Sequence, residues 1–369
     1  MDFEFSEDQQ ALRDAVQRWV GGDYAFERRR AIVAAGGFDR AAWDGLMGLG
    51  LGGLVVPEAQ GGLGFGAVEA MVVMEELGRG LVVEPYAQGA LIAPALLQAG
   101  AVALRDAWLP RIAAGEALVV LAQQERGARY ALDRTATRAV DGRLHGTKSL
   151  VPAGDRADAF IVPAVSDAGL GLYLVERGAA GVGTRGYALQ DGSRAAELHL
   201  ADAPATRLVG PDHAQAALEL GVDVGIAALC AEGVGAMERL TRLTAEYLNT
   251  RKQFGVPIAT FQALRHRIAD VKMQLELARS MSYFATLKLG APARERRRAL
   301  AQAKVQLGAS ARFVGQQCTQ LHGGIGVTDE YIGSHYFKRL TVMELQFGDS
   351  LHQLGVVSAL MDDTAGVFA

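Results

Sequence analysis

The sequence contains very little cysteine and no excess of positive charge. Cys230 and Cys318 are its two cysteines among 369 residues, too few for a disulfide framework, so both are expected to be reduced, buried thiols in a cytoplasmic protein. The formal net charge is −4, which argues against nucleic acid as a partner. The N-terminal segment MDFEFSEDQQ is acidic and lacks an apolar core, so no signal peptide is expected.

Long uninterrupted apolar runs are also missing. The most apolar helix-length run, residues 220–237, is interrupted by Asp223 and Glu232. Acidic side chains are costly inside a bilayer, so we expect a tightly packed buried helix and no membrane span. The histidines show no HxxxH spacing and the cysteines no CxxC spacing, so no metal site is predicted. The chain also has no GxSxG nucleophile elbow and no GxxxxGK phosphate loop.

The chain does contain enough apolar sequence for a large core, since half of its residues are hydrophobic. Its length predicts two to three domains at roughly 150 residues each. Residues 1–116 show helical spacing, opened by a capping box at Ser6 and Gln9. Short β-prone runs follow over 117–212, and helical spacing returns over 213–369. We therefore predict an α+β, mostly α protein with an N-terminal helical domain, a small central β-barrel or sandwich and a C-terminal helical bundle.

The predicted strands and the later helices have defined positions. The β-prone runs cover 118–123, 158–165, 171–176 and 195–202, with turn residues between them. The later helices are expected over 221–250, 263–289 and 295–321, with a further helix around Tyr336.

Two glycine-rich segments are candidates for cofactor binding. Gly61–Gly66 could be taken for a dinucleotide loop, but that motif needs a preceding strand. Its surroundings are helical, so we expect a tight loop in which backbones approach closely. Gly323–Gly326 follows a predicted helix, and it either ends that helix or forms an anion-binding nest.

Three separated motifs resemble one known family. The stretch YLNTRKQFGVPIATFQ (residues 247–262) and the stretch QLHGGIG (residues 320–326) closely resemble the acyl-CoA dehydrogenase family. The early segment GLVVPEAQGGLG (residues 53–64) fits the same family. The chain looks most similar to the branch of pimeloyl-CoA dehydrogenase small subunits. The resemblance implies the acyl-CoA dehydrogenase fold, with a C-terminal four-helix bundle.

The resemblance also implies a chemistry and a set of binding residues. It implies an FAD-dependent oxidoreductase of fatty acid metabolism that removes an α-proton and a β-hydride from an acyl-CoA thioester. Arg251 would reach the FAD pyrophosphate of a neighbouring subunit, and Phe254 would pack on the cofactor. Gln320, Gly323 and Gly324 would receive the adenine and diphosphate end. Electron-transfer flavoprotein would be the electron acceptor, and the chain would work in an oligomer.

The catalytic base that the family usually carries is absent. Phe347 stands where the family has the glutamate of its Y-E-G-T turn, and Gly225 stands at the alternative position on the earlier helix. Asp349 is our candidate catalytic residue as a relocated base; its two alternative roles are a contact with the cofactor and a hydrogen bond to backbone. Asp223 lies about 200° from Gly225 around a helix and is expected to face away. Glu344 is expected to be a structural residue.

The motifs that hold the flavin ring in the family are degraded as well. The chain has QERGARY at residues 124–130 where relatives have T-E-P-x-A-G-S, and Leu150-Val151-Pro152 where they have W-I-T. The hydroxyl donors and the tryptophan are therefore lost, while the motifs at the adenosine end persist.

These departures leave several interpretations open. The first is a homo-oligomeric FAD-dependent acyl-CoA dehydrogenase with a relocated base such as Asp349. The second is a non-catalytic or half-site subunit of a heterotetramer, in which a partner chain supplies the glutamate. A flavin-dependent oxygenase on the same fold and a scaffold without cofactor are two further possibilities. The acyl group cannot be identified, although the pimeloyl-type resemblance suggests long, cyclic or dicarboxylic ones.

Overall fold

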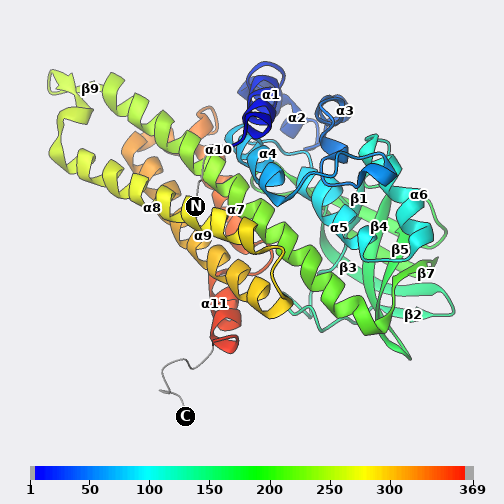
Figure 1. The fold of residues 1–369 in the computed structure, drawn as a ribbon. Helices are drawn as coiled ribbons and strands as arrows, with labels where there is room; N and C mark the ends of the chain where they lie inside the picture. Colours follow the sequence, from blue (N-terminus) through cyan, green and yellow to red (C-terminus); the bar gives the residue numbers. More distant parts are fainter. Residues whose placement is uncertain (1–4, 362–369) are drawn as a thin grey trace, which may run out of the picture.

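The computed structural model describes residues 5–361, and its elements run in the order helices, sheet, helices (Figure 1). The capping box predicted at Ser6 and Gln9 opens the first helix. The helical elements of the first part are α1 (Glu7–Asp23), α2 (Phe26–Ala34), α3 (Arg40–Gly48), η1 (Leu51–Gly53), η2 (Glu58–Gln60), α4 (Ala67–Arg79), η3 (Ala87–Ile92), α5 (Ala93–Gln98) and α6 (Val102–Ala113). Element η3 is a π-helical turn, a rare form that often occurs at functional sites.

The middle of the chain forms one mixed sheet. Its strands are β1 (Val119–Leu121), β2 (Arg138–Val140), β3 (Arg143–Pro152), β4 (Ala159–Ser166), β5 (Gly169–Glu176), β6 (Val182–Ala188), β7 (Arg194–Pro204) and β8 (Thr206–Val209). They lie in the order β6-β7-β3-β2-β4-β5-β8, and β1 pairs in parallel with β4. The four predicted runs fall on β1, β4, β5 and β7. The other strands escaped prediction because exposed polar residues interrupt their apolar positions.

The last part of the chain forms the helical bundle. Its elements are α7 (Pro211–Thr250), β9 (Lys252–Gln253), β10 (Val256–Pro257), η4 (Ile258–Thr260), α8 (Gln262–Lys288), α9 (Ala293–His322), η5 (Gly323–Val327), α10 (Ile332–Leu345) and α11 (Ser350–Ala359). Helix α7 begins at Pro211, earlier than the predicted residue 221, because proline is well tolerated in the first turn of a helix. It runs diagonally from the sheet to the β9 end of the molecule (Figure 1).

Within residues 5–361, α7 is the one helix long and apolar enough to cross a membrane by length and composition, and 89% of its most apolar window is buried inside the protein.

Helices α4 and α7 pack with their backbones almost in contact. A Cβ atom added to Gly78 would lie 2.0 Å from the carbonyl oxygen of Glu232, and one added to Gly235 would lie 1.8 Å from that of Glu75. Any side chain at either glycine would push the helices apart. These two contacts therefore fix the register that presents Gly225 and Glu232 of α7 to the interior.

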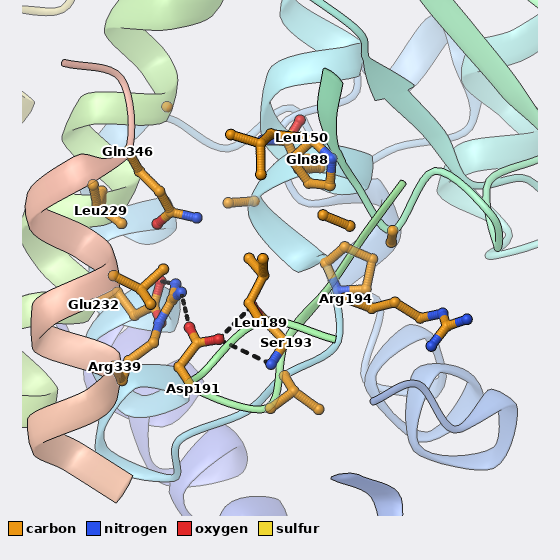
Figure 2. A pocket seen from close by; sticks show the side chains of 18 of the residues that line it. Gln88, Leu150, Leu189, Asp191, Ser193, Arg194, Leu229, Glu232, Arg339 and Gln346 are labelled. Carbon is orange, nitrogen blue, oxygen red and sulfur yellow. Dashed lines mark hydrogen bonds and ion pairs between the residues drawn. The ribbon is translucent and has the colours of Figure 1, made fainter. Parts of the chain in front are cut away.

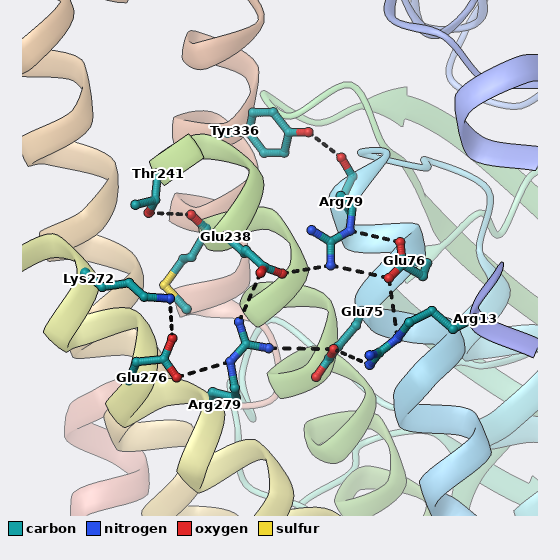
Figure 3. A network of polar contacts seen from close by, with 11 residues as sticks. Arg13, Glu75, Glu76, Arg79, Glu238, Thr241, Lys272, Glu276, Arg279 and Tyr336 are labelled. Carbon is teal, nitrogen blue, oxygen red and sulfur yellow. Dashed lines mark hydrogen bonds and ion pairs between the residues drawn. The ribbon is translucent and has the colours of Figure 1, made fainter. Parts of the chain in front are cut away.

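A network of charged side chains continues this contact toward α1 and α8 (Figure 3). Glu75 of α4 is 1% exposed and pairs with Arg13 of α1 at 3.2 Å. Arg79 of α4 pairs with Glu238 of α7 at 2.7 Å, and Arg279 of α8 pairs with Glu238 at 3.5 Å. Burial raises the pKa of Glu75 even though Arg279 and Arg13 act to lower it. The network joins four helices that are distant in the sequence.

The glycine-rich loop Gly61–Gly66 is a tight loop, as predicted. A Cβ atom added to Gly62 would lie 2.0 Å from the carbonyl oxygen of Val56, so the two backbones touch. In the described part of the chain, no strand comes before this loop, which excludes a dinucleotide-binding unit there.

Buried side chains form clusters that cross the predicted boundaries. One cluster joins the N-terminal helices to the sheet through residues such as Trp43, Tyr86 and Phe160, and another fills the bundle. Both cysteines are free and buried, and burial raises the pKa of Cys230 to about 12 and that of Cys318 to about 11. The division into domains at 1–116, 117–212 and 213–369 stays a prediction.

Candidate active site

A cavity of about 510 Å³ lies where the N-terminal helices, the sheet and the bundle meet. Its wall combines segment 81–88, the end of β3, the turn around Asp191, one face of α7 and the end of α10. Figure 2 shows Gln88 and Leu150 on one side of this space, with Leu229 and Gln346 on the other. Residues from three distant parts of the sequence therefore line this space together.

One end of the cavity is closed by a buried ion cluster (Figure 2). Arg339 binds both oxygens of Glu232 at 2.7 Å and Asp191 at 2.9 Å. Burial by itself lowers the pKa of Arg339, but the two carboxylates raise it above its ordinary value. Asp191 also accepts a hydrogen bond from Ser193 N at 3.0 Å. Both acids are therefore committed to an arginine and are poor candidates for a catalytic base.

A second buried arginine supports this end. Arg29 is 1% exposed, and it donates to the carbonyl oxygens of Leu81 at 2.9 Å and Asp191 at 2.6 Å. Its third contact is Nδ1 of His335 at 3.1 Å. Burial lowers the pKa of His335, so the ring stays neutral and can accept this hydrogen bond.

Phe347 and Gly225 stand at the two positions where the family that the chain resembles carries its catalytic base. They meet at the cavity wall. A Cβ atom added to Gly225 would lie 2.6 Å from Cζ of Phe347 and 3.0 Å from Cδ1 of Ile92. The Phe347 ring thus fills the space that a longer side chain at residue 225 would occupy. Phe347 has a φ of +56°, a conformation that costs a bulky residue energy. Both positions line the cavity, and neither carries an acid.

Asp349 lies beside the cavity and has two partners. Its Oδ1 caps α11 by accepting from His352 N at 2.9 Å, and its Oδ2 pairs with Arg129 Nη2 at 2.9 Å. The neighbouring Tyr130 lines the cavity, whereas Asp349 does not. Its contacts hold the loop after β1 against the start of α11, and its catalytic role stays a prediction.

The two other acids considered from the sequence face the bundle. Asp223 is fully buried and pairs with Arg296 at 2.9 Å and Arg297 at 2.7 Å, both on α9, while Gly225 on the same helix lines the cavity. Glu344 accepts from Ser350 N at 3.1 Å, which ties α10 to α11. Neither acid lines the cavity.

The predicted cofactor-binding residues come together at the other end of the bundle. Leu248, Ile258 and Leu321 pack in one cluster, so the two family motifs lie side by side near β9 (Figure 1). The predicted residues themselves are exposed: Arg251, Phe254, Gln320, Gly323 and Gly324. None of them lines the cavity of the same chain.

This end of the bundle has room for a large ligand. Gly323 caps α9 with a φ of +65°, so the segment does end the helix. A Cβ atom added to Gly323 or Gly324 would meet nothing within 4 Å. Phe254 is 89% exposed. The exposed Arg251 guanidinium and the open glycine backbone leave room for a diphosphate group at this end of the bundle.

The degraded flavin-ring motifs form part of the cavity wall. Gln124, Leu150 and Pro152 line it directly. Glu125 points inward and pairs with the buried Lys148 at 2.7 Å, with further hydrogen bonds from Thr137. Burial acts to raise the pKa of Glu125, but Lys148 and the threonines hold it at about 2. This glutamate is structural.

Sequence reasoning missed two polar residues of the cavity, Glu84 and Gln88. They are 5% and 8% exposed, and each has a buried oxygen without a hydrogen-bond partner in the described structure. The sequence does contain a signal that could have pointed to Glu84, because it is the one charged residue in the apolar run 81–97. A lone acid in a run that must be buried marks a candidate site.

Comparison with known proteins identifies relatives for the whole chain. The model of the acyl-CoA dehydrogenase N-terminal domain matches residues 6–116, and that of the C-terminal domain matches residues 214–361. Acyl-CoA dehydrogenase IpdE2 of Mycobacterium tuberculosis is 32% identical, over 90% of this chain and 91% of its own length. Acyl-CoA dehydrogenase FadE27 of the same organism is 29% identical, over 99% and 100%.

Solved structures agree with these relatives. The ChsE4-ChsE5 complex from Mycobacterium tuberculosis superposes with a TM-score of 0.89 at 29% identity, covering 97% of this chain and 98% of that one. A variant of the Tcur3481-Tcur3483 steroid ACAD gives 0.88 at 30% identity, covering 96% and 97%.

Proposed function

Because this chain belongs to the acyl-CoA dehydrogenase family, we propose that it works in an FAD-dependent enzyme that introduces an α,β double bond into an acyl-CoA thioester. The observation that carries the proposal is the cavity at the junction of helices, sheet and bundle, in the fold of that family. FAD, when bound, accepts the hydride that leaves the β-carbon. Electron-transfer flavoprotein is the proposed acceptor of the electrons afterwards.

The cofactor is proposed to span two chains. The flavin ring would lie in the cavity, beside Leu150 and Gln346, which line it. Arg251 and the open glycines at residues 323–324 lie at the far end of the bundle and do not line that cavity. One chain would therefore enclose the ring, while Arg251 and Gln320 of another chain hold the diphosphate and adenine. The bidentate geometry of a guanidinium suits a pyrophosphate.

The surface around Arg251 supports an oligomer. Large apolar side chains are exposed there: Phe254, Val256, Phe261, Ile325 and Val327. Exposed apolar side chains in such number are typical of a protein contact. A second chain that covers them would lie next to Arg251.

Two arrangements of the base are compatible with this assembly. In the first, all chains are identical and a base such as Asp349 acts beside the cavity. In the second, this chain is a half-site subunit, and a partner chain carries the glutamate. The contact between Phe347 and Gly225 favours the second, because hydrocarbon occupies both family positions of the base. The proposed role of this chain's cavity residues is then to bind and orient an acyl group and exclude water.

The first experiment is the visible absorbance spectrum of the purified chain, followed by anaerobic titration with acyl-CoA thioesters. A flavin-to-chain ratio near one, with bleaching of the flavin band, would establish a self-sufficient dehydrogenase. A ratio near zero in a folded chain that gains flavin and activity with a glutamate-bearing partner would establish the half-site subunit. Absence of flavin and of acyl-CoA binding in both settings contradicts the proposal.

The Asp349→Asn variant separates the two arrangements. Asparagine keeps a side-chain oxygen that can cap α11, so the fold should persist. If Asp349 is the base, bleaching by acyl-CoA should slow by at least about 10²-fold. If the partner supplies the base, the rate should change by less than about tenfold, reflecting only the lost Arg129 pair.

A further inference from the structure

A buried histidine lies at the β9 end of the bundle, among the exposed residues predicted to bind the cofactor. His322 is 3% exposed, whereas its neighbours Arg251, Gln320, Gly323 and Gly324 are exposed. A buried imidazole has two ring nitrogens that need hydrogen-bond partners, because an unsatisfied polar group away from water is costly. The partners of His322 therefore show which segments of the chain it holds together.

Two hydrogen bonds fix the orientation of the His322 ring. Its Nδ1 lies 2.8 Å from the carbonyl oxygen of Cys318, and its Nε2 lies 2.7 Å from the hydroxyl oxygen of Tyr331. Because a carbonyl oxygen can only accept, Nδ1 carries the proton and donates it to Cys318. Burial lowers the pKa of His322, so the ring is neutral and Nε2 accepts from the Tyr331 hydroxyl. Both nitrogens are thus engaged within the chain.

The ring also packs against two tyrosines from different segments. The ring centroid of Tyr247 lies 4.7 Å from that of His322, and the ring centroid of Tyr331 lies 4.8 Å from it. Tyr247 belongs to the last turn of α7, where its carbonyl oxygen accepts a hydrogen bond from Arg251 N at 2.8 Å. Tyr331 comes directly before α10. Aromatic contacts at these distances are favourable, so His322 joins the ends of α7 and α9 to the start of α10.

The glycine turn after His322 folds back onto the same helix end. A Cβ atom added to Gly326 would lie 2.6 Å from the carbonyl oxygen of Thr319 and 3.0 Å from Cβ of His322. The turn that carries Gly323 and Gly324 is therefore packed on its own helix at His322. Through Tyr247, the same ring contacts the helix end from which Arg251 projects. The position of His322 thus sets the separation between the glycine backbone and the arginine.

We propose that His322 is a positioning residue for the cofactor, which holds Arg251 and the backbone of residues 323–324 at the separation that the diphosphate of FAD requires. This inference rests on the proposed function, because it assumes that the diphosphate binds at this end of the bundle. His322 acts through these neighbours, since Cys318 and Tyr331 already use both of its nitrogens. Groups that are held in place before binding lose less entropy when the ligand binds, and this raises the affinity.

The test is titration of the assembled enzyme, freed of flavin, with FAD, followed by the fluorescence of the flavin. His322→Phe keeps an aromatic ring between the tyrosines but removes both hydrogen bonds, so the dissociation constant of FAD should rise about tenfold or more. Tyr331→Phe removes only one of these bonds and keeps its ring, so the rise should be about fivefold. This milder variant tests the inference by itself if His322→Phe does not fold.

Two further measurements separate positioning from a general loss of structure. At saturating FAD, the visible spectrum of the bound flavin should be the same in the wild type and in both variants, because the flavin ring would lie in the cavity of another chain. The double variant should bind FAD no more weakly than His322→Phe, because the Tyr331 hydroxyl acts only through the His322 ring. His213→Phe is the matched control: this histidine is exposed in the first turn of α7, at the opposite end from Arg251, and FAD affinity should not change.

The outcomes distinguish this inference from the proposed function. If the wild type binds FAD and both variants bind it equally well, the inference is wrong and the proposed function stands. A flavin spectrum that changes together with the affinity also overturns the inference, because His322 would then support the fold as a whole. Additive losses in the double variant would show that Tyr331 does not act through His322. If the wild type takes up no FAD in any assembly, the proposed function itself fails.

Discussion

At the scale of single residues, Lys148 and Glu125 show how a buried charge is stabilised by a partner of opposite charge. Lys148 of β3 is fully buried, and its Nζ contacts Glu125 at 2.7 Å and Thr135 at 2.9 Å. Burial lowers the pKa of Lys148 to about 8, although Glu125 acts to raise it. The pair anchors the loop after β1 to β3, directly behind the cavity wall. Its role is positional, because the ammonium group of Lys148 and the carboxylate of Glu125 bind each other.

Replacing Lys148 by methionine should destabilise the fold. Glu125 would remain buried with hydrogen bonds but without its cation, which typically costs about 3 kcal/mol or more. Urea unfolding measures this change. Lys272→Met is the control: that lysine is 58% exposed and pairs with Glu276 on the surface of α8, so less than about 1 kcal/mol should be lost. Equal losses in the two variants would contradict a buried structural pair.

The same pair predicts a pH dependence. The pKa of Glu125 falls from 4.5 to about 2 on folding, so the folded protein binds this proton less readily than the unfolded chain. Its contribution to stability is therefore complete above pH 4.5 and is lost as the pH falls toward about 2. The difference in unfolding free energy between the wild type and Glu125→Gln should shrink across this window. A difference independent of pH there would show that the carboxylate is not the stabilising form.

At the scale of elements, the backbone contact between α4 and α7 determines the position of the α7 residues that line the cavity. Gly78 and Gly235 allow it, and the charges of Glu75, Arg79 and Glu238 surround it (Figure 3). Because α7 also supplies Gly225 and Leu229 to the cavity wall, a shift of these helices changes the shape of the site. Small residues at this crossing therefore serve both packing and function.

Gly78→Ala should be strongly destabilising. Its new methyl group would lie 2.0 Å from the Glu232 carbonyl oxygen, and backbone cannot move away as a flexible side chain can. Overpacking of this kind costs about 1–3 kcal/mol. Gly48→Ala, near the end of α3 with nothing within 4 Å, is the control and should be neutral or slightly stabilising. Thermal unfolding compares the two, and a neutral Gly78→Ala would show that the helices are not in this register.

At the scale of the whole molecule, the candidate site is split. The cavity lies among the helices, sheet and bundle, whereas the motif residues Arg251 and Gln320 lie at the β9 end (Figure 1). If the cavity and the β9 end bind two parts of one cofactor, a single chain cannot form the complete binding site. Oligomerisation is then a requirement of the chemistry, in addition to any contribution to stability.

Arg251→Ala should separate cofactor binding from folding. Arg251 is exposed at the end of α7, so its loss should leave the melting temperature of the apoprotein within about a degree or two. The flavin-to-chain ratio of the assembled enzyme should fall at least about tenfold, because a charge-assisted contact to the pyrophosphate is lost. Arg242→Ala, also on exposed α7 surface, is the control. Undiminished flavin in Arg251→Ala would exclude the proposed role.

The sequence by itself determined the order of elements, the strands β1, β4, β5 and β7, the tight loop around Gly62 and the family. These features depend on local periodicity, turn chemistry and short motifs, all of which are set by residues close together in the sequence. It also indicated that Phe347 and Gly225 cannot supply a base. That conclusion needs only residue identities.

Only the tertiary structure decided which residues share the cavity. The contact of Phe347 with Gly225, the pairing of Asp223 with α9 and the unpaired Glu84 all join segments distant along the chain. Local patterns do not encode such contacts, because the register of α4 on α7 and the closure of the sheet set them together. A glutamate in an apolar run, such as Glu84, therefore has no assignable role until packing shows which groups surround it.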